Sequence, residues 1–170
     1  MATNQPRTAR HPSRLPSRSQ RTAAAGADPD PAAVEHVASY AGWYAQSGHP
    51  LTSWSYVLEH GTVMPGGAPI PRVGPLGQCF SNAGRIALET RYRYCEGFAL
   101  SNHSLAMLVQ HAWIVDENGT AWETTWPHGG ASYFGIVFSD RCHREALAEH
   151  GTWDLLDAMI RRTLDGRPGR

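Results

Sequence analysis

Cys79 has the sequence setting of a nucleophile. It lies in the stretch "GQCFSNA" (residues 77–83), between a run rich in Gly and Pro and a segment with the apolar spacing of a helix. The unpaired backbone N–H groups and the dipole at a helix N-terminus favour a thiolate. The same amides could bind the oxyanion of an acyl intermediate, with Gln78 and Asn82 as candidate side-chain donors. The alternative for Cys79 is a buried, inert cysteine.

A thiol nucleophile needs a base, and His111 is the candidate. It lies in the predicted strand 107–116, where alternation places His111 and Trp113 on one face. The loop Glu117-Asn118-Gly119 that follows matches a favoured three-residue hairpin connection with Gly in the left-handed conformation. In this register Glu123 pairs with Trp113 and shares the face of His111, at a diagonal position within reach of a long side chain.

The role of Glu123 depends on this register. With a three-residue loop, its carboxylate accepts a hydrogen bond from one ring nitrogen of His111 and leaves the other nitrogen for Cys79. A two-residue Asn118-Gly119 loop would turn Glu123 to the opposite face, because a slip of one residue flips every side chain. The alternatives are then a core histidine bonded to backbone and a solvent-facing glutamate.

Three tryptophans crowd the same hairpin. Trp113, beside His111, is the candidate wall of a substrate pocket. Alternation turns Trp122 away from Glu123, and it also turns Trp126 away from His111.

The helices that must position these residues are predicted from hydrophobic spacing. They cover residues 30–47, 79–91, 139–151 with Ser139 as N-cap, and 152–164. Residues 53–60 alternate as a strand, with a helical turn as the alternative. Residues 61–77 hold so much Gly and Pro that they predict a loop leading into Cys79.

Four further segments predict an antiparallel sheet: residues 92–100, 107–116, 120–126 and 132–138. In the first of them Cys95 is assigned to the core, and Gly97 marks either a close approach of a ligand or backbone, or a bulge. The predicted fold class is α+β, with a central helix that starts at Cys79 and packs on the antiparallel sheet.

The combination resembles a family grouping. A cysteine that opens a helix, then "HAW" on a strand, then an acid before Thr on the next strand, is similar to the core of the transglutaminase-like and papain-like cysteine superfamily. The resemblance covers about residues 75–138, and the third position is Glu where the transglutaminase pattern usually has Asp. It implies a papain-like core with Cys79 as nucleophile, His111 as base and Glu123 as the residue that orients the histidine.

Composition bounds the rest of the chain. The chain has 170 residues and no net charge, and its fifteen basic residues are all arginine. We predict a disordered tail over residues 1–30, one domain over 31–165 and a disordered end over 166–170.

The tail is rich in arginine and has no acid before Asp28, so a transit peptide and a nucleic-acid-binding arm stay open as alternatives to a solvated tail. No segment is apolar enough for a secretory signal or a membrane span, which predicts a cytoplasmic protein.

Cysteine and histidine spacing limits the chemistry. Cys79, Cys95 and Cys142 do not have the spacing of a disulfide scaffold, and neither a Cys-x-x-Cys nor a His-Glu-x-x-His motif occurs. We therefore expect reduced thiols, no metal and no cofactor.

The predicted function is cysteine-dependent acyl-enzyme catalysis, by a hydrolase or an acyltransferase, on an amide, ester or thioester of a small molecule or peptide. The alternative is a non-catalytic binding protein on the same fold. Nucleic acid is expected to bind only through the arginine-rich tail, and no membrane partner is expected. The sequence leaves the substrate and the oligomeric state open.

Overall fold

The computed structural model describes residues 53–65, 67–102 and 107–164, together with six single positions nearer the N-terminus. These six are all helical, as predicted for their segment: Glu35, Ala38, Ser39, Gly42, Trp43 and Gln46. The predicted tail over residues 1–30 and the predicted end over 166–170 lie outside the described residues.

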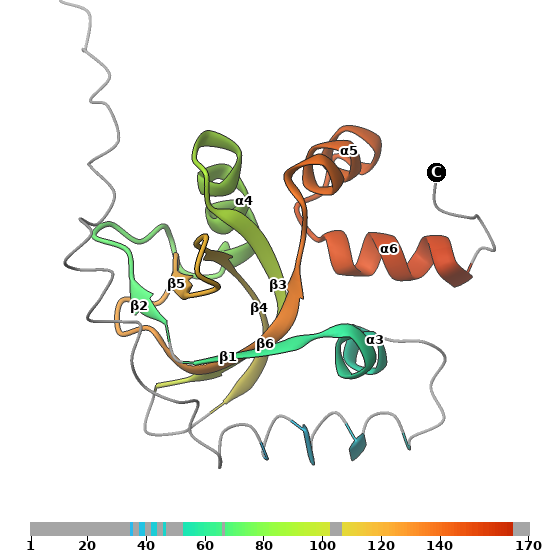
Figure 1. Ribbon diagram of the computed structural model, residues 1–170, viewed down its shortest axis with the longest axis horizontal. Helices are drawn as coiled ribbons and strands as arrows, with labels where there is room; N and C mark the ends of the chain where they lie inside the picture. Colours follow the sequence, from blue (N-terminus) through green and yellow to red (C-terminus); the bar gives the residue numbers. More distant parts are fainter. Residues whose placement is uncertain are drawn as a thin grey trace, which may run out of the picture.

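A six-stranded sheet forms the centre of the molecule (Figure 1). Its strands are β1 (Thr62–Pro65), β2 (Ala68–Pro69), β3 (Arg93–Ser101), β4 (Leu108–Val115), β5 (Ala121–Glu123) and β6 (Gly130–Val137). They lie in the order β1-β6-β3-β4-β5-β2. The pairs are antiparallel except for β2 with β5, which is parallel. The α+β class and the antiparallel arrangement of the four predicted strands are confirmed.

Four helices in the described part of the chain cover one face of this sheet. They are α3 (Ser53–His60), α4 (Cys79–Glu89), α5 (Asp140–His150) and α6 (Leu155–Leu164). The helices pack on this face in two clusters: one includes Tyr94, Ala112 and Ile114 of the sheet, and the other includes Phe98 and Phe134. None of the helices described is long and apolar enough to cross a membrane.

The opposite face of the sheet forms a second core. Side chains from five strands meet there, among them Met64 of β1, Trp113 of β4, Ala121 of β5 and Tyr133 of β6. Strands from near both ends of the strand order can share one cluster only if the sheet curls around it, as Figure 1 shows. We call this side the inner face. By alternation, His111 and Glu123 belong to it.

Two expectations for residues 53–77 are wrong. Residues 53–60 form helix α3 rather than a strand, because Trp54, Val57 and Leu58 line one helical face and Val57 is completely buried. The Gly- and Pro-rich segment that follows is not all loop, since it contributes β1 and β2. Both are edge strands, where a proline without a backbone N–H is tolerated.

The capping signals predicted for the C-terminal half are confirmed. The Ser139 hydroxyl accepts the backbone N–H of Cys142, and α5 ends at Gly151 in the left-handed conformation. The last helix starts at Leu155, three residues later than predicted.

A buried carboxyl group attaches α6 to the sheet. Glu96 of β3 is fully buried, and its Oε2 accepts the backbone N–H groups of Leu155 (2.9 Å) and Leu156 (3.3 Å) at the start of α6. Burial, followed by the neighbouring Asp154 carboxylate, holds the pKa of Glu96 well above its usual value of 4.5. The fold therefore favours the protonated form of Glu96.

This pKa shift predicts a pH dependence of stability. A carboxyl group whose pKa is raised by folding stabilises the fold fully below the unfolded pKa of 4.5, and it loses that contribution as the pH rises toward the folded value. Because glutamine mimics the protonated carboxyl, Glu96→Gln is expected to lose less stability than the wild type between pH 5 and 8. Urea unfolding midpoints at the two pH values measure the difference. The exposed Glu89→Gln on α4 is the control, and a Glu96→Gln curve parallel to the wild type would contradict the prediction.

Candidate active site

The hairpin between β4 and β5 has the predicted register. Ile114 pairs with Trp122 and Val115 with Ala121, while the backbone N–H of Asp116 donates to the carbonyl of Thr120 (3.1 Å). Residues 117–119 therefore form a three-residue loop. Gly119 has φ +81°, the left-handed conformation that this connection requires. Glu123 is thus on the inner face with His111.

The Glu123 carboxylate is fully buried and completely hydrogen-bonded. Its Oε1 accepts the backbone N–H groups of Thr124 (2.8 Å), Thr125 (2.6 Å) and Trp126 (3.1 Å). Its Oε2 accepts the hydroxyl of Tyr133 (2.8 Å) and lies 2.9 Å from Nε2 of His111. Three successive N–H groups converge on one oxygen, so the backbone turns directly after Glu123. This is why β5 ends there instead of continuing to residue 126 as predicted.

The same turn corrects the prediction for Trp126. Its ring does not point away from His111 but stacks on the imidazole, with centroids 4.0 Å apart and planes 14° apart. Alternation would have directed Trp126 elsewhere only if the strand had continued. The stacked ring fixes the plane of His111, while Glu123 occupies its Nε2 and leaves Nδ1 for another partner.

The pKa values of Glu123 and His111 are shifted in opposite directions, as in an ion pair. Burial alone lowers the pKa of His111, but hydrogen bonding with Cys79 and Glu123 and the negative charges of both raise it to about 9. Burial raises the pKa of Glu123, yet the hydrogen bond and charge of His111, with the Tyr133 hydroxyl, lower it below 4.5 overall. The pair is therefore ionised at neutral pH, with the imidazolium next to the Cys79 sulfur.

Cys79 is the first residue of α4, as predicted, and is largely buried. The first backbone bond within the helix runs from the N–H of Asn82 to the carbonyl of Gln78 (2.8 Å). The N–H groups of Cys79, Phe80 and Ser81 therefore have no acceptor within the helix. Their dipoles favour negative charge on the Cys79 sulfur and on an oxygen bound beside it.

Cys79 and His111 come from opposite faces of the sheet. Helix α4 lies on the helix-covered face, whereas His111 is on the inner face. The two side chains interact through a hydrogen bond, beside the point where β5 ends and the turn 124–126 begins. Side-chain Nδ2 of Asn82 donates to Oγ1 of Thr125 (2.9 Å) in this turn, which attaches the start of α4 to it.

The other predicted site residues have different roles. Asn82 is not an oxyanion donor, since its Nδ2 also donates to the carbonyl of Pro75 (2.9 Å) and both amide hydrogens are used. Trp113 is not a pocket wall, because it is completely buried among inner-face residues and its Nε1 donates to the sulfur of Met64 (3.4 Å). Gln78 is exposed and makes no capping bond with its side chain, so it stays available as a donor.

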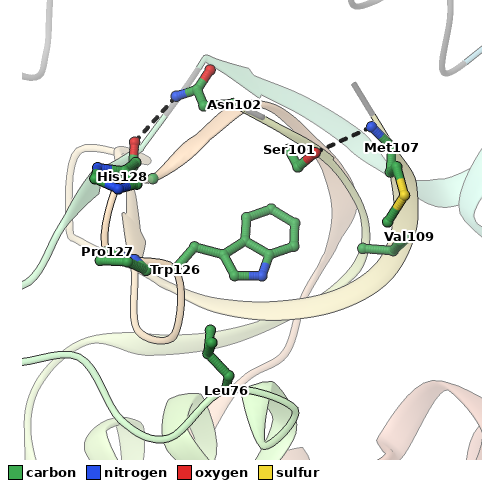
Figure 2. A pocket seen from close by; sticks show the side chains of 9 residues that line it. Leu76, Ser101, Asn102, Met107, Val109, Trp126, Pro127 and His128 are labelled. Carbon is green, nitrogen blue, oxygen red and sulfur yellow. Dashed lines mark hydrogen bonds between the residues drawn. The ribbon is translucent and has the colours of Figure 1, made fainter. Parts of the chain in front are cut away.

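A cavity of about 590 Å³ opens on the inner face beside Trp126. Figure 2 shows strands that curve around it, with the Trp126 ring in the middle and Val109 at one side. One lining residue, Trp126, stacks on His111, and another, Leu76, precedes Cys79 by three residues in the sequence. The sequence did not predict the contact of Trp126 with His111. The alternation of side chains does not show where a strand ends, so it carried no signal for this contact.

Comparison with known proteins found no family model that matches the chain, and no significant match among curated proteins or solved structures.

Proposed function

We propose that this protein is a cysteine-dependent enzyme that forms an acyl-enzyme on an amide, ester or thioester, and that its fold contains the core of the transglutaminase-like and papain-like cysteine superfamily. The observation that carries the proposal is the buried Glu123–His111 pair, held next to a cysteine at a helix N-terminus. A helix that begins at the cysteine and packs on an antiparallel sheet supports the superfamily assignment.

The arrangement supplies each part of an acyl transfer. The imidazolium of His111 stabilises the Cys79 thiolate, which attacks the substrate carbonyl carbon. The amides at the start of α4, with Gln78, bind the oxyanion. His111 then gives its proton to the leaving group, and water or an amine, deprotonated by His111, releases the acyl group from sulfur. Glu123 acts through His111 as a positioning residue.

Selective alkylation of Cys79 tests the proposal. At pH 7, iodoacetamide is expected to modify Cys79 about tenfold faster than Cys142, because the thiolate is the nucleophile. Peptide mapping by mass spectrometry gives the rate at each site. Cys142 is the fair comparison, since it is more exposed than Cys79, whereas Cys95 is completely buried.

Two variants control the measurement. Cys79→Ser must remove the fast reaction, and Cys142→Ser must leave it unchanged. Equal, slow modification of Cys79 and Cys142 would contradict the enzyme and favour a non-catalytic binding protein.

A further inference from the structure

We propose that the cavity beside Trp126 binds the acyl group of the substrate, and that this group is apolar and uncharged. The inference rests on the proposed function, because it names the substrate class of the same site. It goes beyond that function by assigning a side of the substrate, the acyl side, to a particular cavity.

The lining of the cavity selects against charge. Its walls are formed mainly by apolar side chains, among them Leu76, Met107, Val109, Trp126 and Pro127. No Asp, Glu or Arg belongs to the part of the lining that the structure describes. A charged ligand group would be desolvated by this apolar surface, which is unfavourable, and the exposed His128 imidazole is the one side chain in the described lining that could carry a counter-charge.

Two polar side chains in the lining hydrogen-bond within the protein. Figure 2 shows both bonds. Nδ2 of Asn102 donates to the carbonyl of His128 (3.2 Å), and Oγ of Ser101 accepts the backbone N–H of Met107 (3.1 Å). A ligand thus meets mainly aliphatic and indole surface, as an alkyl chain or an aromatic ring requires, and the His128 imidazole and the Ser101 hydroxyl are the polar groups beside it.

Size and position assign this surface to the acyl side. A volume of about 590 Å³ is within the range of small-molecule sites, and it exceeds what an acetyl group needs. Leu76 and Met107 are 72% and 57% exposed, so they form an apolar rim through which a chain can enter. Because Trp126 lines the cavity and its ring stacks on His111, we infer that a group bound in the cavity extends its carbonyl past this ring toward Cys79.

Hydrolysis of such a substrate takes place in two steps. The bond from Cys79 Sγ to the carbonyl carbon forms while the bond from that carbon to the leaving oxygen or sulfur breaks, and the leaving group takes the proton from His111. Water then adds its hydroxyl to the acyl carbon and returns a proton to His111, as the carbon–sulfur bond breaks and the carboxylic acid leaves.

Chain-length preference tests the acyl assignment. We expect kcat/KM to be about tenfold higher for 4-nitrophenyl hexanoate than for 4-nitrophenyl acetate, and lower again for 4-nitrophenyl hydrogen glutarate, which carries a carboxylate. Leu76→Asp and Met107→Glu place a charge on the exposed rim, where folding tolerates it, and each should reduce the hexanoate-to-acetate ratio about tenfold. Ala148→Glu on the exposed side of α5 is the matched control and should keep the wild-type ratio.

A binding measurement separates this inference from the proposed function. The uncharged fluorophore N-phenyl-1-naphthylamine is expected to bind Cys79→Ala protein, and to lose that binding when Leu76→Asp is added. Binding without ester turnover by the wild type would support the apolar site and contradict the acyl-enzyme function. Turnover through Cys79 without a chain-length preference and without fluorophore binding would overturn the inference and leave the function standing.

Discussion

Glu123→Gln is expected to reduce Cys79-dependent turnover of 4-nitrophenyl acetate by about 10⁴-fold, the loss known for the same acid-to-amide change in a Ser-His-Asp triad. The reason lies in the two oxygens of Glu123. Oε1 accepts three backbone N–H groups, so the amide oxygen of Gln must take that place. The amide NH₂ then replaces Oε2 and donates to Nε2 of His111.

The imidazole would consequently change its tautomer. An Nε2 that accepts a hydrogen bond carries no proton, so the ring is neutral with its one proton on Nδ1, and Nδ1 can then no longer take the proton of the Cys79 thiol. The pKa of His111 should fall from about 9, because the carboxylate charge that raises it is gone. Imidazole ¹⁵N shifts of His111 report the tautomer directly, and a merely structural role of Glu123 would not move them.

The controls for this prediction come from the same hairpin. Glu117→Gln lies in the exposed loop and should leave turnover and the His111 spectrum unchanged. His111→Ala removes the base completely, so its turnover rate is the reference for full loss of base catalysis. Turnover of Glu123→Gln within tenfold of the wild type, with Nε2 still protonated, would contradict the triad.

Gly97→Ala is expected to reduce the free energy of unfolding by about 3 kcal/mol. Gly97 lies in the centre of the sheet, between His111 of β4 and Gly135 of β6. An added Cβ would collide with the carbonyl oxygen of Phe134 and lie 2.5 Å from Cα of Gly135. Both are backbone atoms of a paired strand, so neither can move away as a flexible side chain would.

Urea unfolding measures this cost. Gly42→Ala is the matched control, because a Cβ at Gly42 meets nothing within 4 Å and alanine favours a helix by up to about 1 kcal/mol. An unchanged unfolding free energy for Gly97→Ala would show that β3 and β6 can separate at no cost.

The close approach of β6 to Gly97 also decides between the two expectations for this glycine, a ligand or backbone nearby or a bulge. The neighbour is backbone, and the irregularity in β3 occurs at Leu100 and Ser101 instead.

Much of the candidate site could be predicted because it depends on local rules. The start of α4 at Cys79 follows from apolar spacing after a Gly- and Pro-rich run, and the register of Glu123 follows from a three-residue loop that ends in glycine. Residues 53–60 were harder, since Trp54, Tyr56 and Leu58 alternate as in a strand. Burial of Val57 against the sheet decided for the helix.

The roles of Trp126 and Asn82 depended on contacts between distant segments. Alternation tells which face a side chain takes while a strand lasts, but it does not tell where the strand stops. Here β5 stops because the buried Glu123 carboxylate collects three successive N–H groups, and the resulting turn places Trp126 on His111. Asn82 is then bonded to that turn rather than to a substrate.

The sequence by itself therefore determined the α+β class, the helix that begins at Cys79 and the shared face of His111 and Glu123, because periodicity and turn length are local properties of the chain. Only the tertiary structure decided that a residue on the helix-covered face meets a residue on the inner face. That meeting requires a curled sheet with β5 ending beside His111, and both features arise from packing and buried hydrogen bonds between segments far apart in the chain.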